Sequence, residues 1–399
     1  MGENKFIQYY SRKAVQKAIV EVSADREVSS MHGEAFGRRP DTVQFPGDVL
    51  DMAKKGATSF HVSEERWKDP MDLKPGMLKK DLDENRKGWD LILDIDTPYW
   101  DYARWCSYLL VEAIKSYNIE NISVKFSGSK GFHIGLPFEA FPDKVGGVKT
   151  KDLFPALPKI LTLFLEDRIS ERLAQKMLEK DNISNILAMT GKKRKEIMKK
   201  EKFNPFSLVD IDTILISSRH MFRSPYSMHE KTKLVSLPID CDRVLMFKKK
   251  EAKPDNVKVN LKYLDRAAVK KNEAKQLIIQ AYDWHSKKFK KNEKDDEAEK
   301  FYELPKKAIG EEHFPACIAN ILKGGMEDGK KRALFILINF LRSVGWDIKT
   351  TKARVKEWNK KNKEQLREVY INAQMSWHSK QRGTVLPPNC ANDGYYKDL

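Results

Sequence analysis

Two aspartates at the end of a short apolar segment have the spacing of a metal-binding pair. Asp94 and Asp96 stand two residues apart in WDLILDID, 89–96, and a short apolar run of this kind is typical of a strand. Because side chains alternate along a strand, both carboxylates point to one face, with their Cα atoms about 7 Å apart. Such a pair also occurs by chance at strand ends and turns, so it needs a second observation.

The segment VDIDTILI, 209–216, is a second, β-branched strand that carries Asp210 and Asp212. Either residue supplies a third carboxylate. Converging carboxylates repel one another unless a divalent cation lies between them, and Mg²⁺ or Mn²⁺ takes hard oxygen ligands. Two such ions stabilise the attacking and leaving oxygens of an in-line displacement, so Asp94, Asp96 and Asp210 would form an acidic triad for nucleotidyl transfer.

The segment SGSKGFH, 127–133, has the composition of a phosphate-binding turn. Gly128 and Gly131 permit positive φ and a close approach of the backbone, so amide and serine hydroxyl groups can surround a triphosphate. Lys130 and His133 would neutralise part of its charge. The alternative is a hairpin turn whose polar residues bind nothing.

A third segment, RHMFRSPYSMHEKTK at 219–233, alternates cations with aromatic rings. Cationic side chains grip phosphates, and an aromatic ring stacks on a base. The groups concerned are Arg219, Phe222, Arg223, Tyr226, His229, Lys231 and Lys233. GRRP (37–40) and SFHVSEERW (59–67) are clusters of the same kind, and a solvated basic turn around Pro225 is the alternative.

The elements expected to position these groups form two domains, as a chain of 399 residues suggests. Apolar periodicity predicts helices over 8–25, 100–117, 155–203, 261–285, 315–323, 329–344 and 349–375. Extended segments are predicted at 89–96, 209–216 and 234–240, with a hairpin over 121–137 and a mainly irregular stretch over 26–88. The charged segment 286–304 cannot bury apolar surface and is expected to be a linker or a solvated helix end. We therefore expect an α+β fold, with a mixed α/β domain over 1–285 and a small all-α domain over 305–399.

The net charge of +17 is most simply explained by a polyanionic partner, because lysines and arginines that neutralise phosphates release bound counterions. A lysine-rich, soluble surface is the alternative. We find no uncharged apolar run of about eighteen residues and no secretory signal, which predicts a cytoplasmic protein that does not enter membranes. The four cysteines are widely spaced, so neither disulfides nor a zinc ribbon is expected.

Taken in order, these motifs resemble the catalytic subunit of archaeal and eukaryotic replicative DNA primases. The resemblance covers about the first 285 residues and rests on REV (26–28), FGRRP (36–40), GATSFHVSEERW (56–67), GWDLILDID (88–96), FSGSKGFHIGLP (126–137) and DIDTILISSRHMFRSPYSMHEKTKLVSLPID (210–240). It implies a primase fold and Mg²⁺ or Mn²⁺ bound by Asp94, Asp96 and Asp210. It also implies nucleotide contacts from Arg38, Ser127, Ser129, Lys130, His133, Arg223, Ser224, His229 and Lys231. Many archaeal members carry a Cys/His zinc knuckle after the DxD strand, whereas Cys106 stands alone here, and so no zinc is expected.

Three later segments resemble the C-terminal domain of the primase large subunit, which helps to hold the initiating nucleotide and the template. They are HFPACIANIL (313–322), GKKRALFILINFLRSVGW (329–346) and WHSKQRGTVLPPNC (377–390). The resemblance implies an initiation and template site formed by Lys330, Lys331, Arg332, Trp377 and His378, with a place in the core as the alternative for Trp377. That domain normally holds a [4Fe–4S] cluster on four cysteines. Only Cys317 and Cys390 match, so no complete cluster is expected.

The sequence thus predicts an archaeal single-chain primase, in which a catalytic module is fused to a reduced initiation module. Its expected activity is the synthesis of short primers de novo on single-stranded DNA from ribonucleoside triphosphates. Use of deoxyribonucleoside triphosphates and contacts with replication proteins stay open, and the expected location is the nucleoid. A primase-polymerase that mainly extends primers with deoxynucleotides is the first alternative, and a catalytically inert nucleic-acid-binding module is the second.

Overall fold

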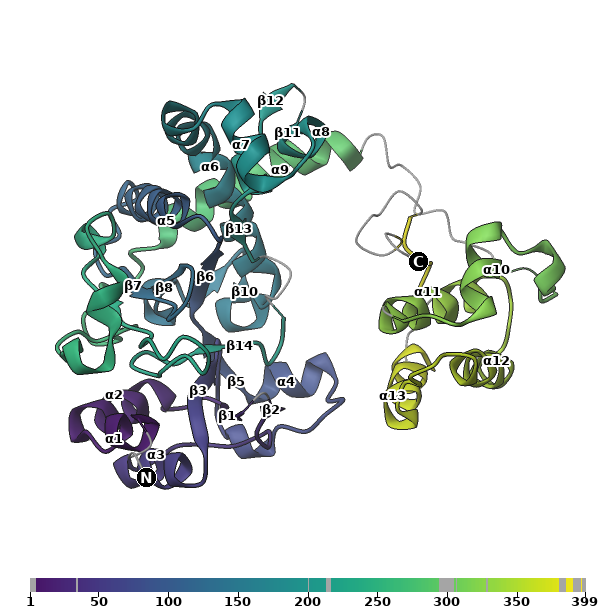
Figure 1. Ribbon diagram of the computed structural model, residues 1–399, viewed down its shortest axis with the longest axis horizontal. Coiled ribbons are helices and arrows are strands. Elements are labelled where there is room, and N and C mark those ends of the chain that lie inside the picture. The colour runs from purple at the N-terminus through teal and green to yellow at the C-terminus, as the bar shows by residue number, and fades with distance from the viewer. Residues whose placement is uncertain are drawn as a thin grey trace. The chain divides into compact units, whose positions relative to one another are not determined.

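The computed structural model describes residues 5–33, 35–199, 201–212, 217–293, 305, 307–327, 329–379, 385–389 and 396. The chain divides into two compact units, Met1–Lys294 and Asp295–Leu399, drawn in Figure 1. Most of the predicted linker 286–304 lies outside the described residues, but 286–293 belong to the last helix of the first unit.

A five-stranded antiparallel sheet forms the centre of the first unit. Its strands run in the order β13 (Asp210–Ile211), β6 (Leu91–Asp96), β8 (Phe132–Leu136), β7 (Ser123–Phe126) and β15 (Pro238–Ile239). The predicted hairpin over 121–137 is confirmed as β7 and β8.

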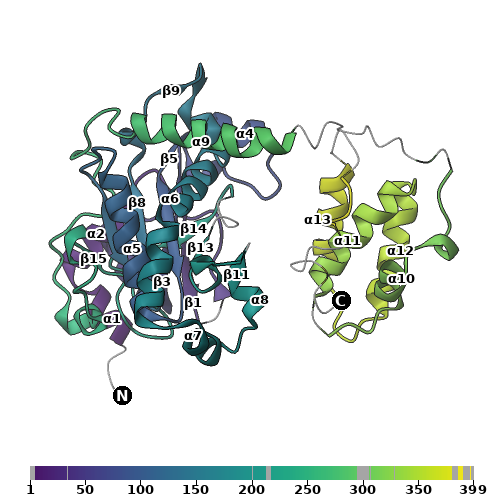
Figure 2. The same cartoon turned by 90° about the horizontal axis from the view of Figure 1, so that it is seen from above.

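One face of this sheet is covered by a helix because alternate strand residues are apolar. Trp100, the first residue of α5 (Trp100–Lys115), stacks on Phe132 of β8 at 5.3 Å between ring centroids and meets Phe126 of β7 edge-on at 5.8 Å. Helix α6 (Ala156–Lys180) packs on α5, and α9 (Lys275–Glu293) packs on α6 (Figure 2). The polar residues that alternate with these rings therefore lie on the other face.

The first unit also contains a second, four-stranded sheet. Its order is β14 (Met221–Arg223), β3 (Ala57–Ser63), β1 (Val28–His32) and β2 (Ala35–Phe36). Helix α3 (Pro46–Lys54) packs on β3. Two further helices near the N-terminus, α1 (Lys5–Tyr10) and α2 (Lys13–Ser23), pack on α3. The remaining elements of the unit are β4 (Glu65–Trp67), α4 (Lys79–Asn85), β5 (Arg86–Trp89), β9 (Lys144–Val145), β10 (Val148–Lys149), α7 (Ile183–Thr190), α8 (Arg194–Ile197), β11 (Met198–Lys199) and β12 (Lys202–Phe203).

Several predicted elements differ from the structure. The helix predicted over 8–25 is two helices, the one over 155–203 is α6 to α8 followed by a short hairpin, and the one over 261–285 begins only at Lys275. The strand predicted over 209–216 is formed at Asp210–Ile211, and residues 213–216 lie outside the described part of the chain.

The second unit is helical, as predicted. It consists of α10 (Ala316–Lys323), α11 (Lys330–Ser343), α12 (Ile348–Lys360) and α13 (Glu368–Ser379), so the single helix predicted over 349–375 is two. Leu337 and Trp358 are fully buried in its separate apolar core. The predicted α+β fold with a small helical part is confirmed. Among the described helices of both units, none is long and apolar enough to cross a membrane.

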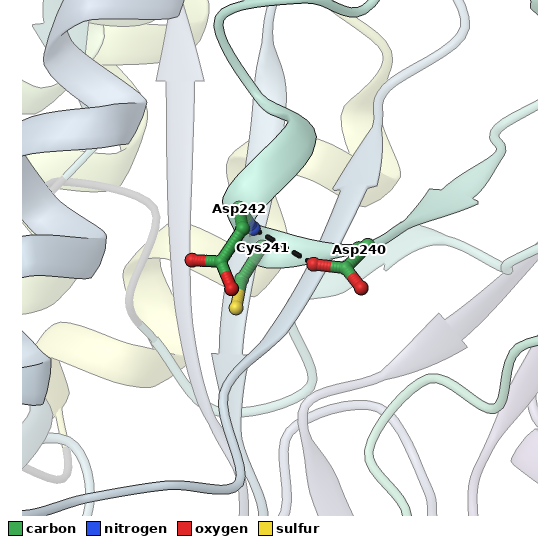
Figure 3. A group of neighbouring side chains, drawn as sticks. All are labelled: Asp240, Cys241 and Asp242. Carbon is green, nitrogen blue, oxygen red and sulfur yellow. Dashed lines mark hydrogen bonds between the residues drawn. The ribbon is translucent and has the colours of Figure 1, made fainter.

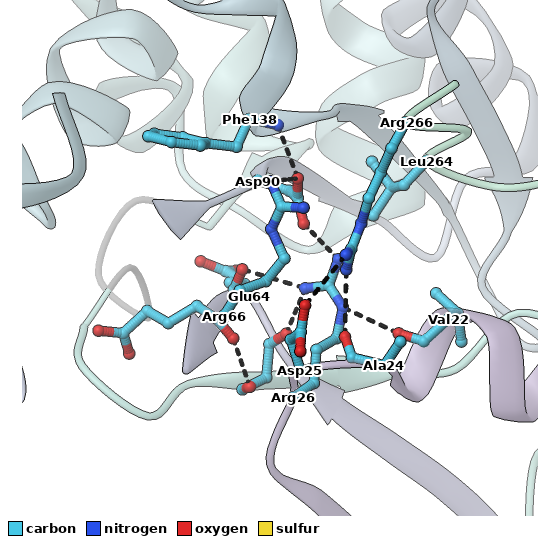
Figure 4. A network of polar contacts seen from close by, with 12 residues as sticks. Val22, Ala24, Asp25, Arg26, Glu64, Arg66, Asp90, Phe138, Leu264 and Arg266 are labelled. Carbon is cyan, nitrogen blue, oxygen red and sulfur yellow. Dashed lines mark hydrogen bonds and ion pairs between the residues drawn. The ribbon is translucent and has the colours of Figure 1, made fainter. Parts of the chain in front are cut away.

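A buried ion network stabilises the first unit next to the central sheet (Figure 4). Asp90 precedes β6 and is fully buried, where it pairs with Arg26 and, at 3.6 Å, with Arg66. The amide of Phe138 donates to Asp90 Oδ1 at 2.7 Å. Burial alone would raise the pKa of Asp90, but the guanidinium groups of Arg66 and Arg26 outweigh it and hold the pKa below the usual value.

We expect Asp90→Asn to cost about 3–5 kcal/mol of unfolding free energy at neutral pH, because it leaves the fully buried Arg26 without its acid, whereas Arg66 keeps Glu139. Since the folded pKa of Asp90 is depressed, its stabilisation is present above the ordinary carboxyl pKa of about 3.9 and is lost as the pH falls through the folded value. Urea unfolding at pH 7 and at pH 3 measures both effects. Glu21→Gln, which breaks the exposed pair with Lys262, is the matched control and should leave the midpoint unchanged. An unchanged midpoint for Asp90→Asn would show that the network does not stabilise the fold.

Candidate active site

Three polar side chains form a row across adjacent strands on the face opposite α5. In the strand register, Asp94 of β6 lies opposite His133 of β8, and His133 lies opposite Lys125 of β7. The Nε2 atom of His133 is 3.3 Å from Asp94 Oδ1, and its Nδ1 atom is 2.9 Å from Lys125 Nζ. The row places a carboxylate, an imidazole and an ammonium side by side.

The second predicted aspartate segment lies at the edge of the same sheet. Asp210 of β13 is the register partner of Asp96 in β6, and the amide of Asp212 donates to the carbonyl oxygen of Asp94 at 3.1 Å. Thus the structure brings Asp210 together with Asp94 and Asp96, although Asp210 is more than a hundred residues from that pair in the chain. Asp212 joins them as a fourth acidic residue.

The carboxylates at this edge raise one another's pKa. Burial, together with the charges of Asp96, Asp212 and Asp210, raises the pKa of Asp94 to about 7, although Lys125 opposes this shift. Burial and the charges of Asp212 and Asp96 also raise the pKa of Asp210. A divalent cation would relieve this repulsion, and the donor set consists of hard carboxylate oxygens, so the residues fit Mg²⁺ or Mn²⁺. Their ligand oxygens do not all lie within 4.8 Å of one another in this structure.

In the described part of the chain, the group whose ligand atoms do lie that close is Asp240, Cys241 and Asp242 (Figure 3). Its compactness has another cause. An Asp240 oxygen caps a short 3₁₀ helix by accepting from the amide of Asp242 at 2.8 Å, and Asp242 pairs with Lys115. Burial raises the pKa of Cys241, which disfavours the thiolate that a metal requires. We therefore assign this group to helix capping.

The turn between β7 and β8 lies beside the acidic edge. The hydroxyl oxygen of Ser127 accepts from the amides of Gly131 and Ser129 at 3.3 and 3.4 Å, and Gly128 has a φ of +99°. The hydroxyl of Thr232 donates to the carbonyl oxygen of Gly128 at 2.6 Å. The glycine turn and the basic segment predicted around 219–233 therefore pack on each other, and the side chain of Lys130 is exposed.

We expect Gly131→Ala to disrupt this arrangement, because a Cβ atom at Gly131 would lie 1.6 Å from the carbonyl oxygen of Ile95. Strand β8 would have to separate from β6 near Asp94 and Asp96, which β6 carries. The expected result is a loss of about 3 kcal/mol in unfolding free energy, which chemical denaturation measures. Gly47→Ala is the matched control, since nothing lies within 4 Å of a Cβ atom there. Equal stability of the two variants would contradict the close approach of β6 and β8.

Cationic groups from β14 and the following loop form the wall next to the turn. Arg223 lies opposite His61 of β3 and pairs with Glu230 at 2.9 Å. The amides of Lys231 and Thr232 donate to Nδ1 of His229 at 3.1 and 3.4 Å, which leaves Nε2 as its proton-bearing nitrogen. Burial and the charge of Arg223 lower the pKa of His229. Burial and the charges of Arg223 and Lys125 likewise lower the pKa of His133 and the pKa of His61.

Three of the predicted nucleotide contacts are placed less favourably. Ser224 is fully buried and donates to the carbonyl oxygen of Pro225 at 3.3 Å, so its hydroxyl serves the turn. Arg38 is exposed in a loop, whereas its neighbour Arg39 pairs with Glu27 at 3.0 Å. Lys231 is also exposed.

In the second unit, the predicted initiation residues belong to two helices. Lys330, Lys331 and Arg332 form the first turn of α11, whereas Trp377 and His378 lie near the end of α13. The side chain of Trp377 is 47% exposed, so the core alternative does not hold for it, and that of His378 is buried. Cys317 is a free thiol, and Cys390 lies outside the described residues.

The structure also brings in Lys125, which the motifs did not single out, and His61, which lies in the predicted cluster 59–67. Lys125 and His61 both lie in strands and face the site, and each is buried. Period-two alternation could have indicated Lys125, because it shares the face of Ser127 and Ser123. Nothing in the sequence links it to His133 before the hairpin register is known.

Residues 92–241 match the family model described as the DNA primase small subunit. The match covers less than half of the chain, but it contains both aspartate segments, the glycine turn and the basic segment. The chain therefore carries a primase-type catalytic domain. It is an enzyme of the nucleotidyltransferase class.

Among solved structures, the chain is similar to one described as the polymerase domain from Mycobacterium tuberculosis ligase D in complex with DNA. The two are 16% identical, and the alignment covers 70% of this chain and 88% of that chain with a TM-score of 0.36. A superposition as loose as this adds nothing to the assignment. A search of the curated proteins gives no match.

Proposed function

We propose that this protein synthesises short primers de novo on single-stranded DNA, with nucleoside triphosphates as substrates and Mg²⁺ or Mn²⁺ as cofactor. The observation that supports this most directly is the pairing of Asp210 with Asp96, on the strand that also carries Asp94, beside a turn and a wall rich in cations. In this arrangement the acidic edge would bind the divalent cations that accompany a nucleotide, and the cationic wall would bind its triphosphate.

In this proposal, Asp94, Asp96 and Asp210 hold the divalent cations. When bound, such ions lower the charge on the reacting phosphate and favour attack by a 3′-hydroxyl. The triphosphate contacts come from the turn residues Ser127, Ser129 and Lys130 and from His133, Arg223 and His229, with Arg38 and Lys231 at the periphery. The polypeptide thus contributes mainly position and charge, as is usual in phosphoryl transfer.

We assign to residues 305–399 the task of holding the initiating nucleotide and the template, with Lys330, Lys331, Arg332, Trp377 and His378 as the candidate contacts. Three cations in the first turn of α11 suit phosphates, because the positive end of the helix dipole lies there as well. Trp377 offers a half-exposed ring for stacking on a base. In this proposal both modules act in one chain, and the DNA template would place the enzyme at the nucleoid.

The test is unprimed synthesis on single-stranded DNA with labelled ribonucleotides or deoxyribonucleotides, and with Mg²⁺ or Mn²⁺. Formation of dinucleotides and short primers without a supplied 3′-hydroxyl is the expected result. Extension of a supplied primer with deoxynucleotides, without any unprimed product, would instead favour a primase-polymerase. DNA binding without synthesis of either kind would leave an inert binding module and refute the proposal.

A further inference from the structure

A dense group of cations precedes the strand that carries Asp210. The segment KKRKEIMKKEK, 192–202, forms α8 and the β11–β12 hairpin, and residue 200 lies outside the described part of the chain. Its exposed cations other than Lys192 form what we call the basic platform: Lys193, Arg194, Lys195, Lys199 and Lys202.

The charge of the basic platform is not compensated by neighbouring carboxylates. Among the described residues, none of its five cations forms an ion pair. Exposed lysines elsewhere in the first unit, such as Lys180, Lys262 and Lys270, do pair with carboxylates. Glu196 lies within the segment, but one of its oxygens accepts from the backbone amide of Lys193 at 2.7 Å. Because crowded like charges repel one another, such a cluster fits a polyanionic partner.

The backbone under the basic platform is held in place by apolar packing. Ile197 of α8 is fully buried in the core of the first unit, and its carbonyl oxygen accepts from the amide of Asn204 at 2.8 Å. Met198 pairs with Phe203 across the β11–β12 hairpin, and both side chains pack against the same core. The cations therefore project from a fixed surface.

This surface is joined to the acidic edge of the central sheet. The Nζ atom of Lys192 donates to the carbonyl oxygen of Ser207 at 2.7 Å, and the hydroxyl of Thr97, which follows β6, donates to that of Leu208 at 2.7 Å. Strand β12 ends seven residues before Asp210, so at most about 25 Å of chain separates them. Both views draw α8 and β11 near β13 (Figures 1 and 2).

We propose that the basic platform binds the phosphodiester backbone of the single-stranded template next to the acidic edge. The inference rests on the proposed function, because unprimed synthesis starts before any duplex exists, and the single strand is then the polyanion that has to be held. Lysine and arginine contacts with phosphates release counterions and carry no sequence information. The binding is therefore strongly salt-dependent and insensitive to base sequence.

The test measures binding of the full chain to a fluorescent oligothymidylate by anisotropy at several salt concentrations, without nucleotides. The variant changes the five platform cations to Gln, which keeps the helix propensity of α8. Each lost phosphate contact reduces the slope of log affinity against log salt by about 0.7, so loss of three contacts makes it shallower by about 2. We expect affinity near 0.1 M salt to fall by at least about tenfold. An unchanged affinity and slope would overturn the proposal and leave the platform to another partner, such as an acidic protein.

The matched control removes the same amount of charge from the helices near the N-terminus. It changes five exposed lysines of α1, α2 and α3 to Gln: Lys5, Lys13, Lys17, Lys54 and Lys55. This variant should bind the oligonucleotide within about twofold of wild type. An equal loss in both variants would show that only net charge matters and would refute a specific surface.

Two further measurements make the result independent of the folding of the five-residue variant. A photoreactive side chain at position 195 of the otherwise unchanged protein should crosslink to the oligonucleotide, whereas one at position 17 should not. No crosslink at position 195, or tighter binding of duplex than of single-stranded DNA by the platform, would overturn the assignment. If the wild type bound DNA in this way but made no product, the proposed function would fail, while the binding result would still decide the role of the platform.

Discussion

Replacing Asp96 by Asn should lower both unprimed synthesis and primer extension by at least about a thousandfold, because a neutral amide cannot hold the divalent cations that carry most of the charge stabilisation in this chemistry. Asp96 is exposed at the sheet edge, so the substitution leaves no buried group without a partner. We therefore expect the thermal midpoint to stay the same. Product formation at saturating nucleotide measures the effect.

The control for Asp96→Asn is Asp242→Asn. Asp242 belongs to the compact acidic group at the 3₁₀ helix cap and pairs with Lys115; it follows β15, at the opposite edge of the sheet from β13. Its substitution should leave synthesis within about twofold of wild type, as is usual for surface changes. DNA binding should be retained in both variants, because the cationic wall is intact. Loss of synthesis in Asp242→Asn together with normal activity of Asp96→Asn would reverse the assignment of the two acidic groups.

Removing residues 295–399 should abolish initiation and spare elongation. Dinucleotide formation needs a second nucleotide to be held beside the first, and in the proposed division of labour the tethered module would supply it at high effective concentration. Without the tether, we expect unprimed synthesis to fall by about a hundredfold or more. Extension of a supplied primer should change by less than about threefold, because the primer brings its own 3′-hydroxyl. Gel analysis of both reactions with the same enzyme preparation gives the ratio of unprimed synthesis to primer extension.

The first unit has its own apolar core, so the shortened chain is expected to fold. A milder variant, with Lys330, Lys331 and Arg332 changed to Ala, should show the same selective loss at smaller amplitude. Equal loss of initiation and extension in the shortened chain would contradict the proposed division of labour.

Much of the candidate site could be predicted because it depends on strand alternation. The DxD spacing puts Asp94 and Asp96 on one face whatever the rest of the chain does. The pairing of Asp210 with Asp96 could not be derived from spacing, because strand order in a sheet is a tertiary property.

Lys125 was missed for a physical reason. A lysine in a strand is ordinarily at the surface. Here it is buried because Ser236, 111 residues later, supplies an acceptor, and His133 Nδ1 lies within hydrogen-bond distance across the hairpin. Neither partner is visible in the local sequence.

The helix predicted over 261–285 begins only at Lys275 for a similar reason. Apolar residues over 261–274 follow a helical period, but Tyr263 and Leu264 pack directly on Gly135 of β8, and the amide of Leu264 donates to Ser123 Oγ at 2.7 Å. The segment is therefore an irregular, turn-rich stretch that packs on the sheet. Tertiary contacts override local helix propensity in such a case.

Mn²⁺ binding, followed by electron paramagnetic resonance in the presence of a non-hydrolysable nucleotide, tests the sharing of divalent cations by the acidic edge most directly. The wild type and Asp242→Asn should bind the ion alike, whereas Asp94→Asn, Asp96→Asn and Asp210→Asn should each weaken binding by at least about tenfold. Undiminished binding in the last three variants would contradict the assignment of these aspartates as the metal ligands.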